Sequence, residues 1–165
     1  MDKIEELLNN PKTDLQKQAL TDKSYKKTPN NQDCKINFEL ATYGDAILKC
    51  ALCKIYFERE NKDNFGFKGK LTEWKKQYES DEVLIKFIAR HYDILNFLNF
   101  DSGDTKKPQD YKYEDKNAKR RYKYIATAME ACIAAVYIEN GENEVIEIVK
   151  KWIRWIDKET NSSDT

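Results

Sequence analysis

The chain has 165 residues and a mass of 19.5 kDa, which is the size of a single domain. Its 29 Lys and Arg balance 29 Asp and Glu, so a globally basic nucleic-acid-binding protein is excluded and a polyanion would have to meet a local basic patch. A hydrophobic fraction of 40% excludes a disordered chain. The sequence shows no stretch of about 20 apolar residues and no signal peptide at its start, which predicts a cytoplasmic protein.

The whole chain is expected to be helical. Only 5 Gly and 3 Pro interrupt it, and apolar residues recur every three or four positions, without the alternation typical of strands. We expect an N-terminal extension over 1–12, one domain over 13–159 and a disordered tail over 160–165. The first helix of the domain is predicted over 13–24, with Thr13 as its N-cap.

The next predicted helix spans 37–60, and its middle is apolar on nearly every side, so we expect it to be buried all round. A short helix is predicted over 71–78, after the glycine at 69. Ser80 is then expected to cap a further helix that carries an apolar face. That face comprises Val83, Leu84, Phe87 and Ile88.

A polar loop is expected over 101–113, followed by a second all-apolar helix over 124–138. This helix should end at Asn140-Gly141, since Gly commonly terminates helices. The last predicted helix, 142–159, has one apolar face at helical spacing and should cover the core. The protein is therefore predicted to be an all-α helical bundle.

Four cysteines occur, and Cys50 and Cys53 form a C-x-x-C pair, which could indicate a metal or redox site. A structural zinc site needs four ligands, and His91 is the one histidine of the chain. Because the pair lies inside an apolar helical pattern, we expect both cysteines to be core residues.

Two acids stand alone in apolar helices. Asp45 is the single charged residue between Glu39 and Lys49, and Glu130 is the single charge in the fourteen residues from Ile125 to Ile138. Most acids in so charged a chain lie on solvated faces. These two are expected to point into the protein.

A buried carboxylate must be neutralised by a proton, by a Lys or Arg, or by a metal ion. Mg²⁺ accepts one or two carboxylates and keeps several waters. Thr127, three residues before Glu130 and on the same helix face, could add a hydroxyl. The residues alone leave two alternatives open, a metal site and a structural ion pair or shared proton.

Four segments occur in the order and spacing of the ribonuclease III catalytic domain, so the chain resembles that family over about residues 13–157. They are LQKQALTDKSY (15–25), NFELATYGDAIL (37–48), GKLTEWKK (69–76) and KNAKRRYKYIATAMEACIAAVYIENG (116–141). The resemblance implies an all-helical endonuclease domain that forms a homodimer. Two metal sites would lie across a valley holding double-stranded RNA, each cutting one strand.

By this resemblance Asp45 and Glu130 match family metal-binding acids. Four of the six family acids are absent, because Phe38, Ala41, Lys68 and Thr127 stand in their places. The compact Mini-III branch shares the Ala and the Thr, lacks the double-stranded-RNA-binding domain and is active. Other relatives keep the fold and lose cleavage.

The best candidate for an RNA surface is the stretch 105–124, which has eight Lys and Arg against three acids and runs into the Glu130 helix. Duplex RNA is contacted through phosphates and 2′-hydroxyls, which suits a local basic segment. An ordinary solvated loop is the alternative interpretation. The predicted RNA-binding residues are Lys106, Lys107, Lys116, Lys119, Arg120, Arg121 and Lys123.

The resulting hypothesis is a homodimeric endoribonuclease that hydrolyses double-stranded or structured RNA. Mg²⁺, or Mn²⁺ as a substitute, would be held by Asp45, Glu130 and Thr127 and would activate a water. The alternative is a degenerate family member that binds RNA or a protein partner without cleavage.

Overall fold

A computed structural model describes residues 1–59, 69–101 and 118–162, with only the backbone described at 118–121 and 162. The all-α prediction is confirmed: the described residues form helices and a single isolated bridge, between Thr21 and Asn99. The predicted loop over 101–113 lies almost wholly outside them. No helix of the described part is long and apolar enough to cross a membrane.

Residues 1–12 are expected to be an extension, but much of this segment is packed into the core. Helix α1 (Lys3–Asn9) buries Ile4, Leu7 and Leu8. Asp2 caps it, accepting hydrogen bonds from the backbone N–H groups of Ile4 and Glu5, while Glu5 accepts one from the N–H of Asp2. Such a capping box compensates for the low intrinsic stability of a seven-residue helix.

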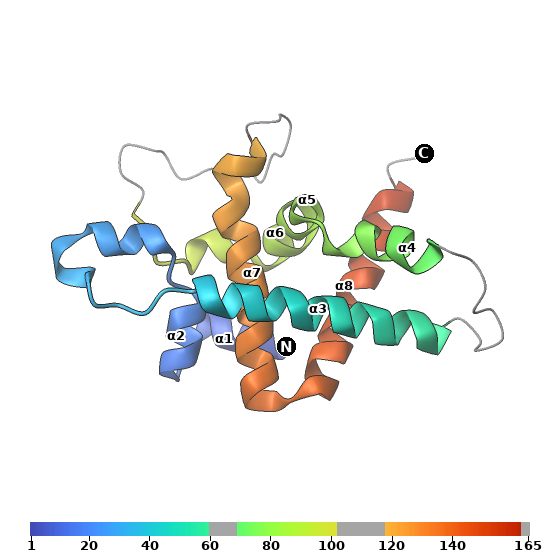
Figure 1. The fold of residues 1–165 in the computed structure, drawn as a ribbon, viewed down its shortest axis with the longest axis horizontal. Coiled ribbons are helices and arrows are strands. Elements are labelled where there is room, and N and C mark those ends of the chain that lie inside the picture. The colour runs from blue at the N-terminus through green and yellow to red at the C-terminus, as the bar shows by residue number, and fades with distance from the viewer. Residues whose placement is uncertain (60–68, 102–117, 163–165) are drawn as a thin grey trace.

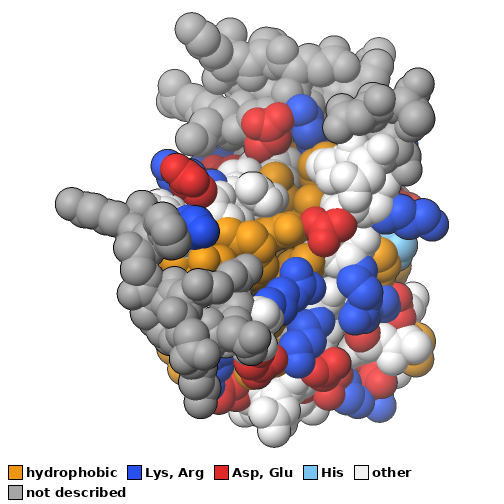
Figure 2. Space-filling view, turned by 90° about the vertical axis from the view of Figure 1, so that its right-hand side faces the viewer, with side chains coloured by type: hydrophobic (Ala, Val, Ile, Leu, Met, Phe, Trp, Pro, Cys, Tyr) orange, Lys and Arg blue, Asp and Glu red, His pale blue; other side chains and the backbone are white. Residues whose placement is uncertain are grey.

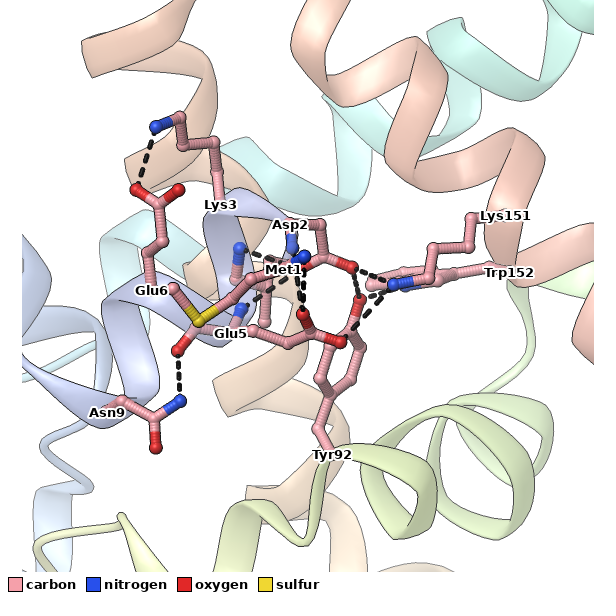
Figure 3. A network of polar contacts seen from close by, with 10 residues as sticks. Met1, Asp2, Lys3, Glu5, Glu6, Asn9, Tyr92, Lys151 and Trp152 are labelled. Atoms are coloured by element: carbon pink, nitrogen blue, oxygen red, sulfur yellow. Dashed lines mark hydrogen bonds and ion pairs between the residues drawn. The ribbon is translucent and has the colours of Figure 1, made fainter.

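A polar network holds α1 against distant parts of the chain (Figure 3). The Asp2 carboxylate accepts a hydrogen bond from the Tyr92 hydroxyl at 2.8 Å and pairs with the Lys151 ammonium at 2.7 Å. Trp152 donates its indole N–H to the same Tyr92 oxygen at 3.0 Å. Burial opposes ionisation of Asp2, yet its hydrogen bonds and the Lys151 charge prevail and lower its pKa.

Helix α2 (Asp14–Ala19) has the predicted Thr13 cap but ends earlier than expected. The chain then forms the 3₁₀ segments η1 (Lys23–Lys27) and η2 (Pro29–Asn31). The reason is the isolated bridge. Asp22 donates its backbone N–H to the Asn99 carbonyl, and the backbone N–H of Asn99 donates to the carbonyl of Leu20. This segment therefore bonds to Asn99 instead of continuing the helix.

The two long helices α3 (Phe38–Arg59) and α7 (Ala118–Asn140) form the most extensive contact of the fold. They cross steeply at the centre of the molecule (Figure 1). At the crossing, a Cβ placed on Gly44 would lie only 1.8 Å from the carbonyl oxygen of Glu130. A side chain at this position is therefore incompatible with the observed approach of the two backbones.

The predicted helix after residue 69 is α4 (Lys70–Glu79). Ser80 caps the next segment as expected, accepting a hydrogen bond from the N–H of Val83. That segment runs through α5 (Asp81–Val83), the π-helical η4 (Leu84–Ala89) and α6 (Arg90–Tyr92), and η5 (Ile94–Asn96) follows. It buries Leu84, Ile85, Ile88 and Ala89 completely.

Helix α7 stops as predicted, because Gly141 takes a left-handed φ of 86°. Helix α8 (Glu142–Ser162) then packs an apolar face on the core, with Trp152 2% exposed. It runs past the predicted end at 159, so the expected disordered tail is wrong for 160–162. Residues 163–165 lie outside the description.

The expectation that the α3 helix is buried on every side is wrong. Its outward face carries a row that we call the α3 stripe, with Tyr43 46% exposed and Phe57 40% exposed. The stripe consists of Tyr43, Ala46, Cys50, Cys53 and Phe57. Cys50 is exposed and Cys53 half-buried, so the prediction that both are core residues is also wrong. Helix α3 is thus apolar on two faces: one is buried against α7, and the other stays largely exposed within the described residues, with Tyr43 in edge contact with the ring of Tyr137.

Replacing Gly44 with Ala tests the crossing. We expect Gly44→Ala to lower the free energy of unfolding by about 3 kcal/mol, since overpacking against backbone exceeds the gain of about 1 kcal/mol in helix propensity. Thermal or urea unfolding measures this. Gly141→Ala is the matched control: it meets nothing within 4 Å, and its left-handed backbone should cost about 1 kcal/mol. Equal losses in the two variants would contradict this interpretation.

Candidate active site

The crossing of α3 and α7 carries both isolated acids. Asp45 follows Gly44, the residue on which the two helices meet, and Glu130 supplies the carbonyl that Gly44 approaches. The backbones can come this close because Gly44 has no side chain and the α7 residues beside it are small and buried, among them Ala126, Ala131 and Ala134. The sequence thus places two carboxylates on the two sides of one helix contact.

Asp45 is not buried as expected. Its side chain is 35% exposed, and Lys49, one turn later on α3, places its ammonium nitrogen 2.6 Å from Asp45 Oδ2. The carboxylate is therefore neutralised by a neighbouring lysine at the edge of the core. Asp45 raises the pKa of Lys49, most strongly through the hydrogen bond between them.

Glu130 is half-buried and is in a different electrostatic situation. Burial raises its pKa to about 7, and the negative charges of Asp45 and Asp81 add to the rise, whereas Lys123 and Lys49 oppose it. No hydrogen bond or ion pair to its carboxylate occurs within the described residues. A proton, a Lys or Arg, or a metal ion could neutralise each carboxylate. In this structure Asp45 is paired with a lysine, and Glu130 retains a proton below about pH 7.

Two further groups act on this site that sequence reasoning did not assign to it. Asp81, in the first turn of α5, raises the Glu130 pKa by its charge, and Glu79, at the end of α4, raises that of Lys49. In the sequence, Asp81 directly follows Ser80, which indicates only that it is an acid in the first turn of the helix that Ser80 caps. Its proximity to Glu130 follows from the packing of α5 on α7, which local patterns do not encode.

Thr127 lies one turn before Glu130 on α7 and is half-buried. Its hydroxyl donates a hydrogen bond of 3.0 Å to the Lys123 carbonyl, and the oxygen lone pairs remain able to accept. Lys123, Thr127 and Glu130 occur at i, i+4 and i+7, so they share one side of the helix.

The donor set suits a hard divalent cation. Carboxylate and hydroxyl oxygens are the ligands that Mg²⁺ and Mn²⁺ prefer, and the Lys49 ammonium shows that a positive charge can reach Asp45. The set is sparse: within the described residues, no three His, Cys, Asp or Glu side chains come together as metal ligands. A bound ion would therefore complete its coordination shell with water or substrate oxygens.

Most of the predicted RNA-binding residues cannot be placed. Lys106, Lys107 and Lys116 lie outside the described residues, and Lys119, Arg120 and Arg121 occupy the first turns of α7 with only their backbone described. Lys123 is exposed on the side of α7 that carries Glu130. The structure therefore places one residue of the predicted basic surface, about 10 Å along the helix from Glu130.

The chain's histidine and its one buried thiol are engaged elsewhere. His91 is exposed on α6 and stacks on Trp155, with ring centroids 3.6 Å apart. Cys132 is fully buried, and burial raises its pKa to about 12, which makes it unreactive at neutral pH. Neither group offers a nucleophile or a base beside Asp45 and Glu130.

Comparison with known proteins agrees with this arrangement. Residues 12–155 match the family described as Ribonuclease-III-like. The chain is 30% identical over 140 residues to Ribonuclease 3 of Azotobacter vinelandii, covering 85% of this chain and 52% of that protein. It is 27% identical over 125 residues to Ribonuclease 3 of Actinobacillus pleuropneumoniae, covering 76% of this chain and 50% of that one. The chain thus spans about half the length of the curated relatives it matches.

A solved structure gives the same result for the fold. The nuclease domain of ribonuclease III from Campylobacter jejuni, described for structural flexibility in a region involved in dimer formation, has a TM-score of 0.61 and 25% identity to this chain. The match covers 94% of this chain and 95% of that domain. The expected resemblance to the ribonuclease III catalytic domain and its helical fold are confirmed.

The raised pKa of Glu130 predicts a pH-dependent gain of stability in Glu130→Gln. The folded protein retains the Glu130 proton up to about pH 7, whereas the unfolded chain releases it near pH 4.5, so folding becomes less favourable as pH rises through this interval. In EDTA, we expect Glu130→Gln to match wild type at pH 4 and to exceed it by about 1–3 kcal/mol at pH 8. Denaturant unfolding at both pH values measures the difference. Glu73→Gln, at an exposed position of α4, should show none, and a pH-independent effect of Glu130→Gln would contradict the pKa.

Proposed function

The chain belongs to the ribonuclease-III-like family, and from this premise we propose that it is a metal-dependent endoribonuclease that hydrolyses phosphodiesters of double-stranded or structured RNA. One observation carries the proposal: the α3–α7 crossing presents Asp45 and Glu130 from two helices whose backbones touch at Gly44. A half-buried carboxylate without a partner among the described residues costs folding free energy. A binding role accounts for its presence better than a structural one.

In this proposal Asp45, Glu130 and the Thr127 hydroxyl hold Mg²⁺, with Mn²⁺ as a substitute. A divalent ion there would lower the pKa of a water and neutralise charge developing on the phosphate. The protein contributes the geometry: α3 fixes Asp45, α7 fixes Glu130 and Thr127, and the Gly44 contact holds the two helices in register. Glu130 must lose its proton to bind, so metal affinity should fall as pH drops below about 7.

RNA would approach along the basic segment that precedes Glu130. Lys123 is exposed two turns before Glu130. A lysine at this position can pair with one RNA phosphate while the scissile phosphodiester lies at Asp45 and Glu130. The side of the molecule near α4 and the later part of α8 is a poor alternative. Figure 2 shows acidic and basic side chains interspersed around an apolar strip on that side, and mixed charges attract a polyanion weakly.

We also propose that the protein is a homodimer formed through the α3 stripe. Its members recur at spacings of three and four residues, which is the pattern of a helix seam that packs against another helix. Four of them, Tyr43, Ala46, Cys50 and Phe57, are exposed. The Campylobacter jejuni domain has a region involved in dimer formation. A second copy would cover this apolar face.

Cleavage of a labelled RNA duplex tests the activity. We expect shortening of the duplex with Mg²⁺, none with EDTA, and a loss of at least about 100-fold in Asp45→Asn and Glu130→Gln, since each removes a charged ligand. Asp14→Asn, at a side chain that is 93% exposed, is the matched control and should cut like wild type. Duplex binding without cleavage by wild type would instead favour a degenerate family member, and equal cleavage by Glu130→Gln would refute the site.

Sedimentation velocity tests the dimer. We expect wild type to sediment as a dimer and Ala46→Glu as a monomer, because the substitution places a charge in the middle of the α3 stripe, while the exposed position leaves the folded monomer intact. Asn143→Glu, which adds the same side chain at an exposed position of α8, should remain dimeric. A monomeric wild type, or a dimeric Ala46→Glu, would remove the α3 stripe from the interface.

A further inference from the structure

The contact between Lys49 and Asp45 differs from an ordinary surface ion pair in its surroundings. The ammonium lies 2.6 Å from Asp45 Oδ2, and both side chains are partly exposed, at 43% and 35%. Asp45 precedes Lys49 by four residues on α3, the favourable order for such a pair. The charges of Glu79 and Glu130 also act on the ammonium. Lys49 therefore occupies the negative field of the candidate site, where a cation would bind.

A divalent ion on Asp45 and this ammonium cannot share the carboxylate at low cost. At about 4 Å, a charge of +2 and a charge of +1 repel strongly even where water screens part of the interaction. The lysine can move, because its side chain is flexible and 43% exposed. The ion would thus displace the ammonium from Asp45 when it binds.

We propose that Lys49 is a positioning residue that competes with the metal: it holds Asp45 in the ion-free site and must leave for the ion to bind. This inference rests on the proposed function, since it concerns the same two acids. Binding of the metal ion is then an exchange of one cation, the Lys49 ammonium, for another at Asp45. Metal affinity is then set partly by the lysine as well as by the oxygen ligands. The displaced ammonium remains on α3 beside the site, where it could pair with an RNA phosphate.

Direct titration of the ion tests the exchange without any measurement of activity. Binding of Mn²⁺ to the purified protein, followed by electron paramagnetic resonance at pH 8, should tighten at least threefold in Lys49→Met, because methionine keeps the length of the side chain and removes the competing charge. Lys49→Arg keeps a charge and should bind Mn²⁺ no more tightly than wild type.

The chain offers a closely matched control in Lys54. It lies on the same helix, is 45% exposed and pairs with Glu142 at 2.5 Å, so Lys54→Met removes one charge and one ion pair away from Asp45. We expect it to change Mn²⁺ affinity by less than half as much as Lys49→Met. An equal gain in both variants would show a general effect of net charge and would overturn the proposal.

The remaining outcomes separate this inference from the proposed function. If Asp45→Asn weakens Mn²⁺ binding but Lys49→Met leaves it unchanged or weaker, the site takes an ion and the competition is refuted. If Lys49→Met binds Mn²⁺ and wild type binds none, the competition is confirmed in its strongest form. If neither binds Mn²⁺, the site does not take an ion and both proposals fail.

Discussion

The contact of Gly44 with the Glu130 carbonyl is the constraint on which the rest of the structure depends. It sets the depth at which α3 and α7 cross, and the other helices pack around this pair. It also sets the site, because Asp45 is the next residue on one helix and Glu130 is the touching residue on the other. A single missing Cβ therefore links the packing of the core to the placement of two carboxylates.

The two acids show how a protein holds charge beside an apolar contact. Asp45, at the edge, forms an ion pair with Lys49, whereas burial raises the pKa of Glu130, which lies deeper, to about 7. Each solution costs less than an unpaired buried ion would. Both are also reversible, because a lysine can swing away and a proton can leave. In the proposed function, the site would therefore be stable without a metal and would still be able to take one, a property that a closed, fully paired ion network would lack.

The sequence predicted what local pattern can encode: the long helices, the Thr13 and Ser80 caps and the stop at Gly141. It missed interactions between distant residues. The ion pair between Asp2 and Lys151 joins residues 149 positions apart in the sequence. The sequence near residue 2 does not indicate that α1 belongs to the core. The exposure of Asp45 and Cys50 was missed for another reason. An apolar helix shows the same pattern whether its faces meet the same chain, a second chain or solvent.

The exposed apolar face of α3 bears on the proposed function, because this one helix carries three features. Its inner face packs on α7, its outer face bears the α3 stripe, and Asp45 with Lys49 lies at the boundary between them. A partner on the stripe would exclude water next to this boundary and restrict the movement of the Lys49 side chain. Since electrostatic interactions strengthen as water is excluded, association through α3 would increase the attraction of Asp45 for any cation beside it. If both proposals hold, oligomerisation and ion binding would be physically coupled through this helix, because the partner that covers the stripe would also tune the site.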